Sequence, residues 1–163
     1  MGFLIDLVKY EAEPDISEVT IPEGVTCISS EAFANCSTLT TISIPNTVEE
    51  IQSCAFENCT SLTSLIIPDS VQMIWSAVFA GCSSLTFVQL SERIESIMYS
   101  TFRDCVSLVS VAIPDSVTNI ASDAFENCPS LKEIILGKNS HFVISNGALW
   151  TKDMQNKIFE LAK

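Results

Sequence analysis

Basic side chains are scarce in this sequence. Its 163 residues contain eight Lys and Arg against twenty Asp and Glu, a formal net charge of −12. Nucleic acids are therefore poor partners, because phosphate binding needs clustered Lys and Arg, and anionic membrane surfaces are disfavoured for the same reason. Residues 1–92 contain twelve acids and one base, whereas residues 93–163 contain eight acids and seven bases. The first half would attract a basic partner or, as a solvated surface, keep the protein soluble.

Long apolar runs and catalytic motifs are also missing. No run of about 18 apolar residues occurs, so we expect no transmembrane helix. The single histidine, His141, has no nearby Cys or Ser in an activating context, and no phosphate loop or dinucleotide motif is present. We therefore expect no enzyme and no cofactor. Residues 1–8 lack the basic stretch and cleavage site of a signal peptide, which leaves two alternatives: an intracellular protein, or a leader that has been removed.

What the sequence does contain is a strict repeat. Hydrophobic residues make up 47% of the chain, enough for a continuous core in one folded domain. An Ile-Pro pair recurs every 23 residues, with Leu90-Ser91 once in its place. Five units follow without insertion: 21–43, 44–66, 67–89, 90–112 and 113–135. Five columns keep one chemical type: Phe33, Phe56, Phe79, Phe102, Phe125; Cys36, Cys59, Cys82, Cys105, Cys128; Leu39, Leu62, Leu85, Leu108, Leu131; Val25, Val48, Val71, Ile94, Val117; and Ile28, Ile51, Ile74, Ile97, Ile120.

A single unit of this length cannot bury its own apolar face, so the units must stack. Residues 39–45 alternate apolar and polar side chains as a half-buried strand does, and their copies would pair about 4.8 Å apart in a parallel sheet. Residues 25–28 fit a second short extended run, and residues 31–36 fit one helical turn. The pattern predicts a solenoid that is mostly β with short helical turns, built from five 23-residue repeats.

The repeat also resembles a known family. The segment LTTISIPNTVEEIQSCAFENC, residues 39–59, is similar to the BspA-like leucine-rich repeats, also called the Treponema pallidum type, and the resemblance covers residues 16–136. It implies a right-handed leucine-rich-repeat solenoid with a parallel sheet on its concave face. It also implies an extracellular or cell-surface protein whose partner is a protein, such as a host matrix or cell-surface protein. The unit that opens with Leu90-Ser91 departs from the pattern, and we expect it to stack with local irregularity.

The ends of the array are expected to act as caps within a single domain, 1–163. Residues 1–20 resemble a hairpin-like entry segment, residues 21–135 are the five repeats, and residues 136–163 resemble a hairpin-like cap with a turn at Asn146-Gly147. Trp150 and Phe142 are expected to close the core. A solenoid end that stays uncapped would expose strand edges, so we expect a monomer or a weak dimer.

Seven cysteines raise the question of a metal or disulfide site. Five of them form one column, where each thiol can donate weakly to a backbone carbonyl of the adjacent turn. Zinc needs four converging ligands, and the only close pair, Cys54 and Cys59, has no partner pair, so we expect no metal. Cys27 and Cys54 lie off the column and are the expected exposed thiols.

Residues that break the repeat template are the candidate binding residues. Exposed strand positions carry Thr or Ser by default, as at Thr41, yet Phe87 and Ile66 are apolar there and belong to adjacent strands. The candidate partner-binding surface is Thr41, Ile66, Phe87, Gln89, Ala112 and Ile135. The alternatives are scattered surface hydrophobes or cover from a terminal segment.

A second candidate patch replaces small residues by bulky ones. It consists of Trp75, Met98 and Tyr99, which either form a contact point or fill a groove beside the helical turn. The sequence as a whole favours a non-catalytic protein-binding or adhesion module that uses its sheet face. The alternative is a structural spacer within a longer surface protein, with no ligand of its own.

Overall fold

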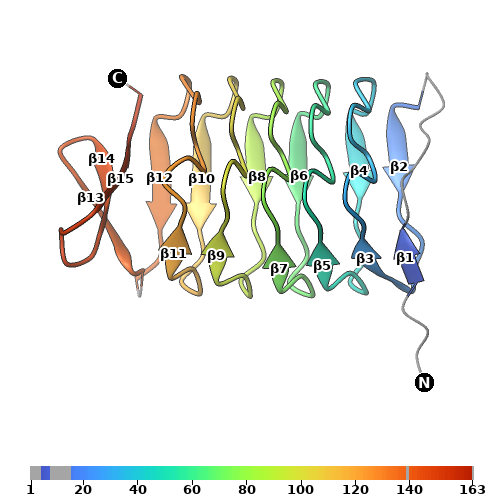
Figure 1. Ribbon diagram of the computed structural model, residues 1–163, viewed down its shortest axis with the longest axis horizontal. Coiled ribbons are helices and arrows are strands. Elements are labelled where there is room, and N and C mark those ends of the chain that lie inside the picture. The colour runs from blue at the N-terminus through green and yellow to red at the C-terminus, as the bar shows by residue number, and fades with distance from the viewer. Residues whose placement is uncertain (1–4, 8–15, 139, 163) are drawn as a thin grey trace.

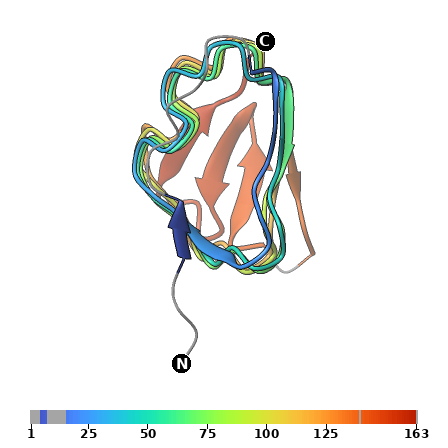
Figure 2. The same cartoon turned by 90° about the vertical axis from the view of Figure 1, so that its right-hand side faces the viewer.

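The computed structural model describes residues 5–7, 16–138 and 140–162, and it winds the repeats into stacked turns (Figure 1). One side of the stack is a row of six parallel strands, whose outer surface we call the sheet face. The strands are β2 (Glu18–Thr20), β4 (Thr41–Ser43), β6 (Ser64–Ile66), β8 (Phe87–Gln89), β10 (Ser110–Ile113) and β12 (Glu133–Leu136). Viewed end on, successive turns nearly superimpose (Figure 2). The predicted solenoid of stacked 23-residue turns with a parallel sheet is confirmed.

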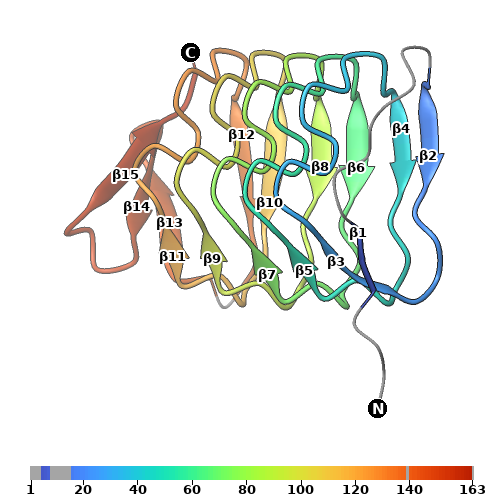
Figure 3. The same ribbon diagram turned by 45° about the vertical axis from the view of Figure 1, so that its right-hand side comes forward.

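A second row of strands follows a different side of the turns, and we call its outer surface the second face (Figure 3). Its strands are β1 (Ile5–Leu7), β3 (Val25–Ile28), β5 (Glu50–Ile51), β7 (Met73–Ile74), β9 (Ser96–Ile97) and β11 (Asn119–Ile120). Most of residues 1–20 lies outside the described residues. Within that segment, β1 pairs parallel with β3 and β2 pairs parallel with β4, so the described strands extend both rows instead of forming a hairpin.

The third side of each turn is not helical. The helical turn expected over residues 31–36 and its copies is wrong, since no described residue is in a helix. In the second turn, Cys54 and Asn58 have φ values of 59° and 58°, in the left-handed region, which a right-handed helix excludes. The backbone N–H groups of Cys54, Phe56 and Asn58 instead donate to carbonyls of the next turn at 3.1, 2.9 and 2.8 Å. Hydrogen bonds between turns therefore replace the bonds along a helix.

The residue before each column cysteine holds this left-handed conformation in every turn. These residues are Asn35, Asn58, Gly81, Asp104 and Asn127, with φ between 56° and 72°. Asn, Asp and Gly are the residues that adopt this conformation most readily. Two of the column's neighbouring pairs also bond to each other, since Asn58 Nδ2 donates to Asn35 Oδ1 at 3.1 Å and Asn127 Nδ2 donates to Asp104 Oδ1 at 2.6 Å. The residues at this position therefore form a further repeat column, in which some side chains bond to their copies in the neighbouring turn.

The core is a continuous stack of repeat columns. The five column phenylalanines are buried, and neighbouring rings lie nearly parallel with centroids 5.2–5.7 Å apart. The Leu, Val and Ile columns are buried around them. Each ring fills the space between the turns before and after it, so the columns predicted from the sequence form the core.

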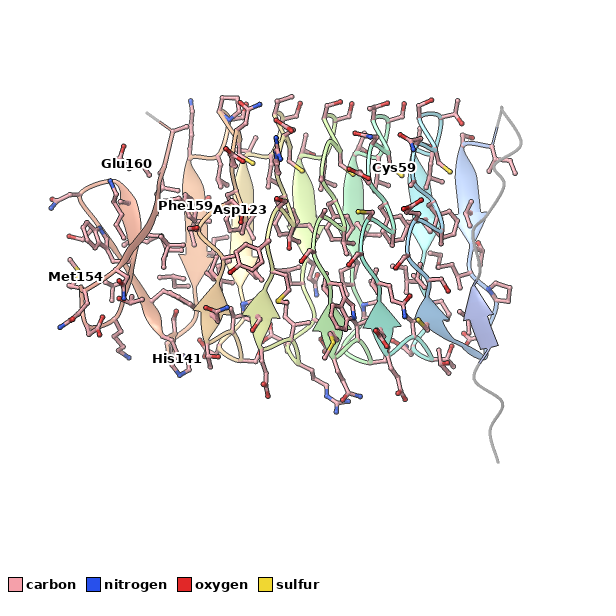
Figure 4. All side chains as sticks on the ribbon, viewed as in Figure 1. Cys59, Asp123, His141, Met154, Phe159 and Glu160 are labelled. Carbon is pink, nitrogen blue, oxygen red and sulfur yellow. The ribbon has the colours of Figure 1, made fainter. Side chains whose placement is uncertain are left out.

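The C-terminal end of the stack is covered by a three-stranded antiparallel sheet. Its strands are β13 (Phe142–Ser145), β14 (Ala148–Thr151) and β15 (Lys157–Glu160), and the first two are joined by the predicted turn at Asn146-Gly147. Phe142 is buried as expected, but Trp150 remains partly exposed and donates its indole N–H to the Ser145 carbonyl at 3.2 Å. Phe159, which the sequence analysis did not single out, covers the last ring of the core with its centroid 4.8 Å from that of Phe125 (Figure 4).

Candidate functional site

The cysteine column has the structural role expected from its spacing. Four of the five thiols donate to the phenylalanine carbonyl of the preceding turn, such as Cys59 to Phe33 at 3.1 Å and Cys82 to Phe56 at 3.1 Å. Burial raises the pKa of Cys59, Cys82 and Cys105 well above the ordinary thiol value. A raised pKa keeps these groups as neutral thiols at physiological pH, so they are poor nucleophiles and poor metal ligands.

The two cysteines outside the column differ from each other. Cys54 is partly exposed as expected, and burial together with nearby Glu57 raises its thiol pKa. The expectation that Cys27 is exposed is wrong, because Cys27 is buried. It lies on β3, between β5 and β1, with Asp6 of β1 opposite it in the register. No cluster of three or more metal-ligating side chains is found within the described part of the chain.

Acid–base groups do not converge on the only histidine. His141 is exposed just before β13, and its side chain lies at the lower edge of the view, away from those of Asp123 and Glu160 (Figure 4). The described residues also include no helix that is long and apolar enough to cross a membrane.

The sheet face carries the apolar residues that break the template. Ile66 on β6 is 60% exposed and Phe87 on the adjacent β8 is 44% exposed. In the register of these strands Ser64 lies opposite Phe87, and Ile66 lies opposite Gln89. Phe87 and Ile66 are thus diagonal neighbours separated by small or polar side chains, and nothing in the fold requires either to be apolar.

A hollow lies beside this pair. Thr41, Ile66 and Phe87 line it together with Ser43 and Ser64, and its volume is about 530 Å³. The hollow lies over a gap in the row of strands. β4 and β6 are neighbours that form no hydrogen-bonded ladder, whereas β2 pairs with β4 and β6 pairs with β8. The hollow thus places the hydroxyls of Thr41, Ser43 and Ser64 beside the exposed apolar side chains of Ile66 and Phe87. That combination is what a binding pocket needs.

The remaining sheet-face candidates continue the same sheet, because β8 pairs with β10 and β10 pairs with β12. Ala112 and Ile135 are opposite each other on β10 and β12 and line a separate hollow of about 300 Å³. Gln89 is exposed but lines neither hollow. Thr41, Ile66 and Phe87 thus line one hollow and Ala112 and Ile135 another, with Gln89 between the two groups on β8.

The second candidate patch is only partly assembled. Trp75 is 39% exposed and lines a groove of about 440 Å³ with Met98, whereas Tyr99 is 64% exposed and does not line this groove. Met73, on β7, is also exposed and lines the groove, although it was not among the residues predicted for this patch. The sequence does indicate Met73, because it is apolar at a repeat position where neighbouring turns carry Glu50 and Ser96.

With the solenoid and its surfaces established, comparison with known proteins identifies the repeat. The model of the BspA type leucine rich repeat region (6 copies) matches residues 8–156. The chain belongs to the BspA-type leucine-rich repeat family. This BspA-type array has the predicted columns and parallel strand rows, so the resemblance drawn from residues 39–59 is confirmed. No curated protein matches the sequence significantly.

Solved structures support the assignment. A leucine-rich repeat protein from Treponema pallidum is 31% identical, with a TM-score of 0.72 over 77% of this chain and 60% of that one. One from Bacteroides ovatus is 38% identical, with a TM-score of 0.69 over 73% of this chain and 33% of that one. The pneumococcal vaccine antigen PcpA, 20% identical, shares the fold with a TM-score of 0.65 over 91% of this chain and 47% of that one. The chain thus spans less than two thirds of each relative.

Proposed function

We propose that this BspA-type array is a non-catalytic protein-binding or adhesion module that contacts its partner through the sheet face. The observation that carries the proposal is the exposed pair Ile66 and Phe87 beside the hollow between β4 and β6. Exposed, clustered apolar side chains mark interfaces, and aromatic residues often supply most of the binding energy. The turns beneath are rigid, because their columns are buried throughout, so the surface binds without reordering.

Charge favours a basic partner. Glu18 on β2 lies opposite Thr41 in the strand register, and the first 92 residues carry twelve acids against one base. Such a field accelerates encounter with a positively charged surface and weakens as salt rises. We propose a protein partner such as a matrix or cell-surface protein, reached by a surface or secreted protein that contains this array. The array itself is proposed to act as a monomer or weak dimer.

The test is capture from a panel of purified extracellular-matrix and cell-surface proteins. We expect the wild-type chain to capture a partner, and the double variant Phe87→Ala/Ile66→Ser to lose it while keeping the wild-type circular dichroism spectrum. Tyr99→Ala is the matched control, since Tyr99 is a large exposed aromatic residue that does not belong to the sheet face. Capture that survives the double variant would refute the assignment of the surface.

A second candidate is a structural spacer. The observation that favours it is the regular stacking of the turns, which lets an array extend without any ligand of its own (Figure 1). Under that account no member of the panel is captured by the folded wild-type chain, and the double variant behaves as wild type does.

A further inference from the structure

The second face contains a gap of its own, at the junction of the third and fourth turns. The backbone N–H groups of Gln72 and Trp75 donate to carbonyls of the second turn at 2.8 and 3.0 Å. The corresponding donors of the fourth turn are those of Glu95 and Met98, and among the described residues neither donates to the third turn. β7 and β9 therefore lie side by side without a ladder.

This gap forms the floor of the groove described above, and Trp75 forms one of its walls. The Trp75 indole N–H donates to Glu50 Oε1 at 2.6 Å, which fixes the plane of the ring before any ligand arrives. Other turns carry Ser29, Gln52 or Ala121 at this position, so neither the core nor the stacking requires a tryptophan. An exposed indole with a fixed plane offers a flat apolar surface with an electron-rich face.

The rest of the lining combines apolar side chains, those of Met73, Ile74 and Met98, with polar ones. Gln72 and Ser96 offer both donors and acceptors, Arg93 offers donors, and Glu95 offers acceptors. The single positive and single negative charge offset each other, so the groove favours an uncharged ligand that can both donate and accept hydrogen bonds. The sheet-face hollow has a different composition, with Ile66 and Phe87 beside small hydroxyl side chains.

We propose that the groove between β7 and β9 binds a neutral hexose-based glycan. One pyranose ring lies with its C–H face on the Trp75 indole, and its hydroxyls bond to Gln72, Arg93 and Glu95. A volume of about 440 Å³ suits a short oligosaccharide segment rather than a single small ion. A peptide that binds by strand addition needs an open outer edge, whereas the unpaired edges of β7 and β9 face each other. The site is separate from the proposed protein-binding surface.

The experiment is ligand-observed NMR by saturation transfer, with chitotriose, cellotriose, maltotriose and mannotriose as probes. We expect at least one trisaccharide to bind the wild-type chain with a Kd of about 1 mM or tighter. Trp75→Ala should weaken that binding about tenfold or more, whereas Trp75→Tyr, which keeps a ring, should weaken it only a few-fold. Phe87→Ala is the matched control and should bind the glycan as wild type does, which separates this site from the sheet face.

Three results would overturn the proposal. The first is no saturation transfer to any of the four trisaccharides from the folded wild-type chain. The second is a trisaccharide affinity in Trp75→Ala that equals the wild-type value. If Trp75→Ala fails to fold, the corresponding result is that Trp75→Tyr and Phe87→Ala change the trisaccharide affinity by the same factor. The third is trisaccharide binding as tight as wild type in both Gln72→Ala and Arg93→Ala, because the polar lining would then not contact the sugar hydroxyls.

Discussion

Removing one ring from the middle of the phenylalanine stack should destabilise the whole array. Phe79 is fully buried, and its centroid lies 5.7 Å from that of Phe56 and 5.5 Å from that of Phe102. Phe79→Ala should lower the free energy of unfolding by about 3–5 kcal/mol, from lost burial and the cavity that remains. Phe79→Leu keeps much of the volume but removes both ring pairs, each contributing about 0.5–1.5 kcal/mol, so it should cost about 1–3 kcal/mol.

The assay is urea unfolding followed by circular dichroism, with Phe87→Ala as control. Phe87 is 44% exposed and outside the stack, so its replacement should change the free energy of unfolding by no more than about 0.5 kcal/mol. Turns of a solenoid are stabilised by their neighbours, so the loss at Phe79 is shared by both flanking turns. A loss below about 1 kcal/mol for Phe79→Ala, with an unchanged denaturant slope, would refute the claim that the stack organises the core.

Three further predictions concern the left-handed column, the cap and the thiols. Gly81 has a φ of 72°, and a Cβ added there requires the flexible Asn58 side chain to shift. Since Asn35, Asn58 and Asn127 hold this conformation in other turns, Gly81→Asn should cost no more than about 1 kcal/mol, whereas the β-branched Gly81→Val should cost more, as measured by thermal melting. Phe159→Ala should uncover Phe125 and cost about 1–2 kcal/mol, with increased binding of a hydrophobic dye; unchanged dye binding would contradict the assigned cap. Burial raises the pKa of Cys105, so as pH rises the thiol of the unfolded chain ionises first, near pH 8.5. The free energy of unfolding should therefore be unaffected below about pH 8 and fall above it. Cys105→Ala should make the urea midpoint less sensitive to pH in this range.

The sequence predicts most of this fold because chemical identity recurs at fixed spacing. Columns such as those of Phe79 and Cys82 assign both the period and the buried side of each turn. The helical turn was predicted wrongly because local composition favoured it, whereas residues such as Cys54 adopt a positive φ that lets backbone groups bond to the next turn. Backbone pairing between turns, and not local propensity, decides the conformation there.

The candidate surfaces were predictable only in part. Template-breaking side chains pointed to Phe87 and Trp75, since a bulky residue at a small-residue position is visible in a repeat. The gaps beneath them, between β4 and β6 and between β7 and β9, depend on spacing between neighbouring backbones, which the period does not encode. The burial of Cys27 and the role of Phe159 likewise depend on terminal segments that do not follow the repeat.

The most direct test of the central claim, that the sheet face binds a protein, is site-specific photo-crosslinking. A photoreactive phenylalanine analogue at position 87 reports on the sheet face, and the same analogue at position 99 reports on an exposed site away from it. The account predicts that illumination with the captured partner yields a covalent complex from position 87 and little or none from position 99. Crosslinking of the partner from position 99 alone would contradict the assigned surface.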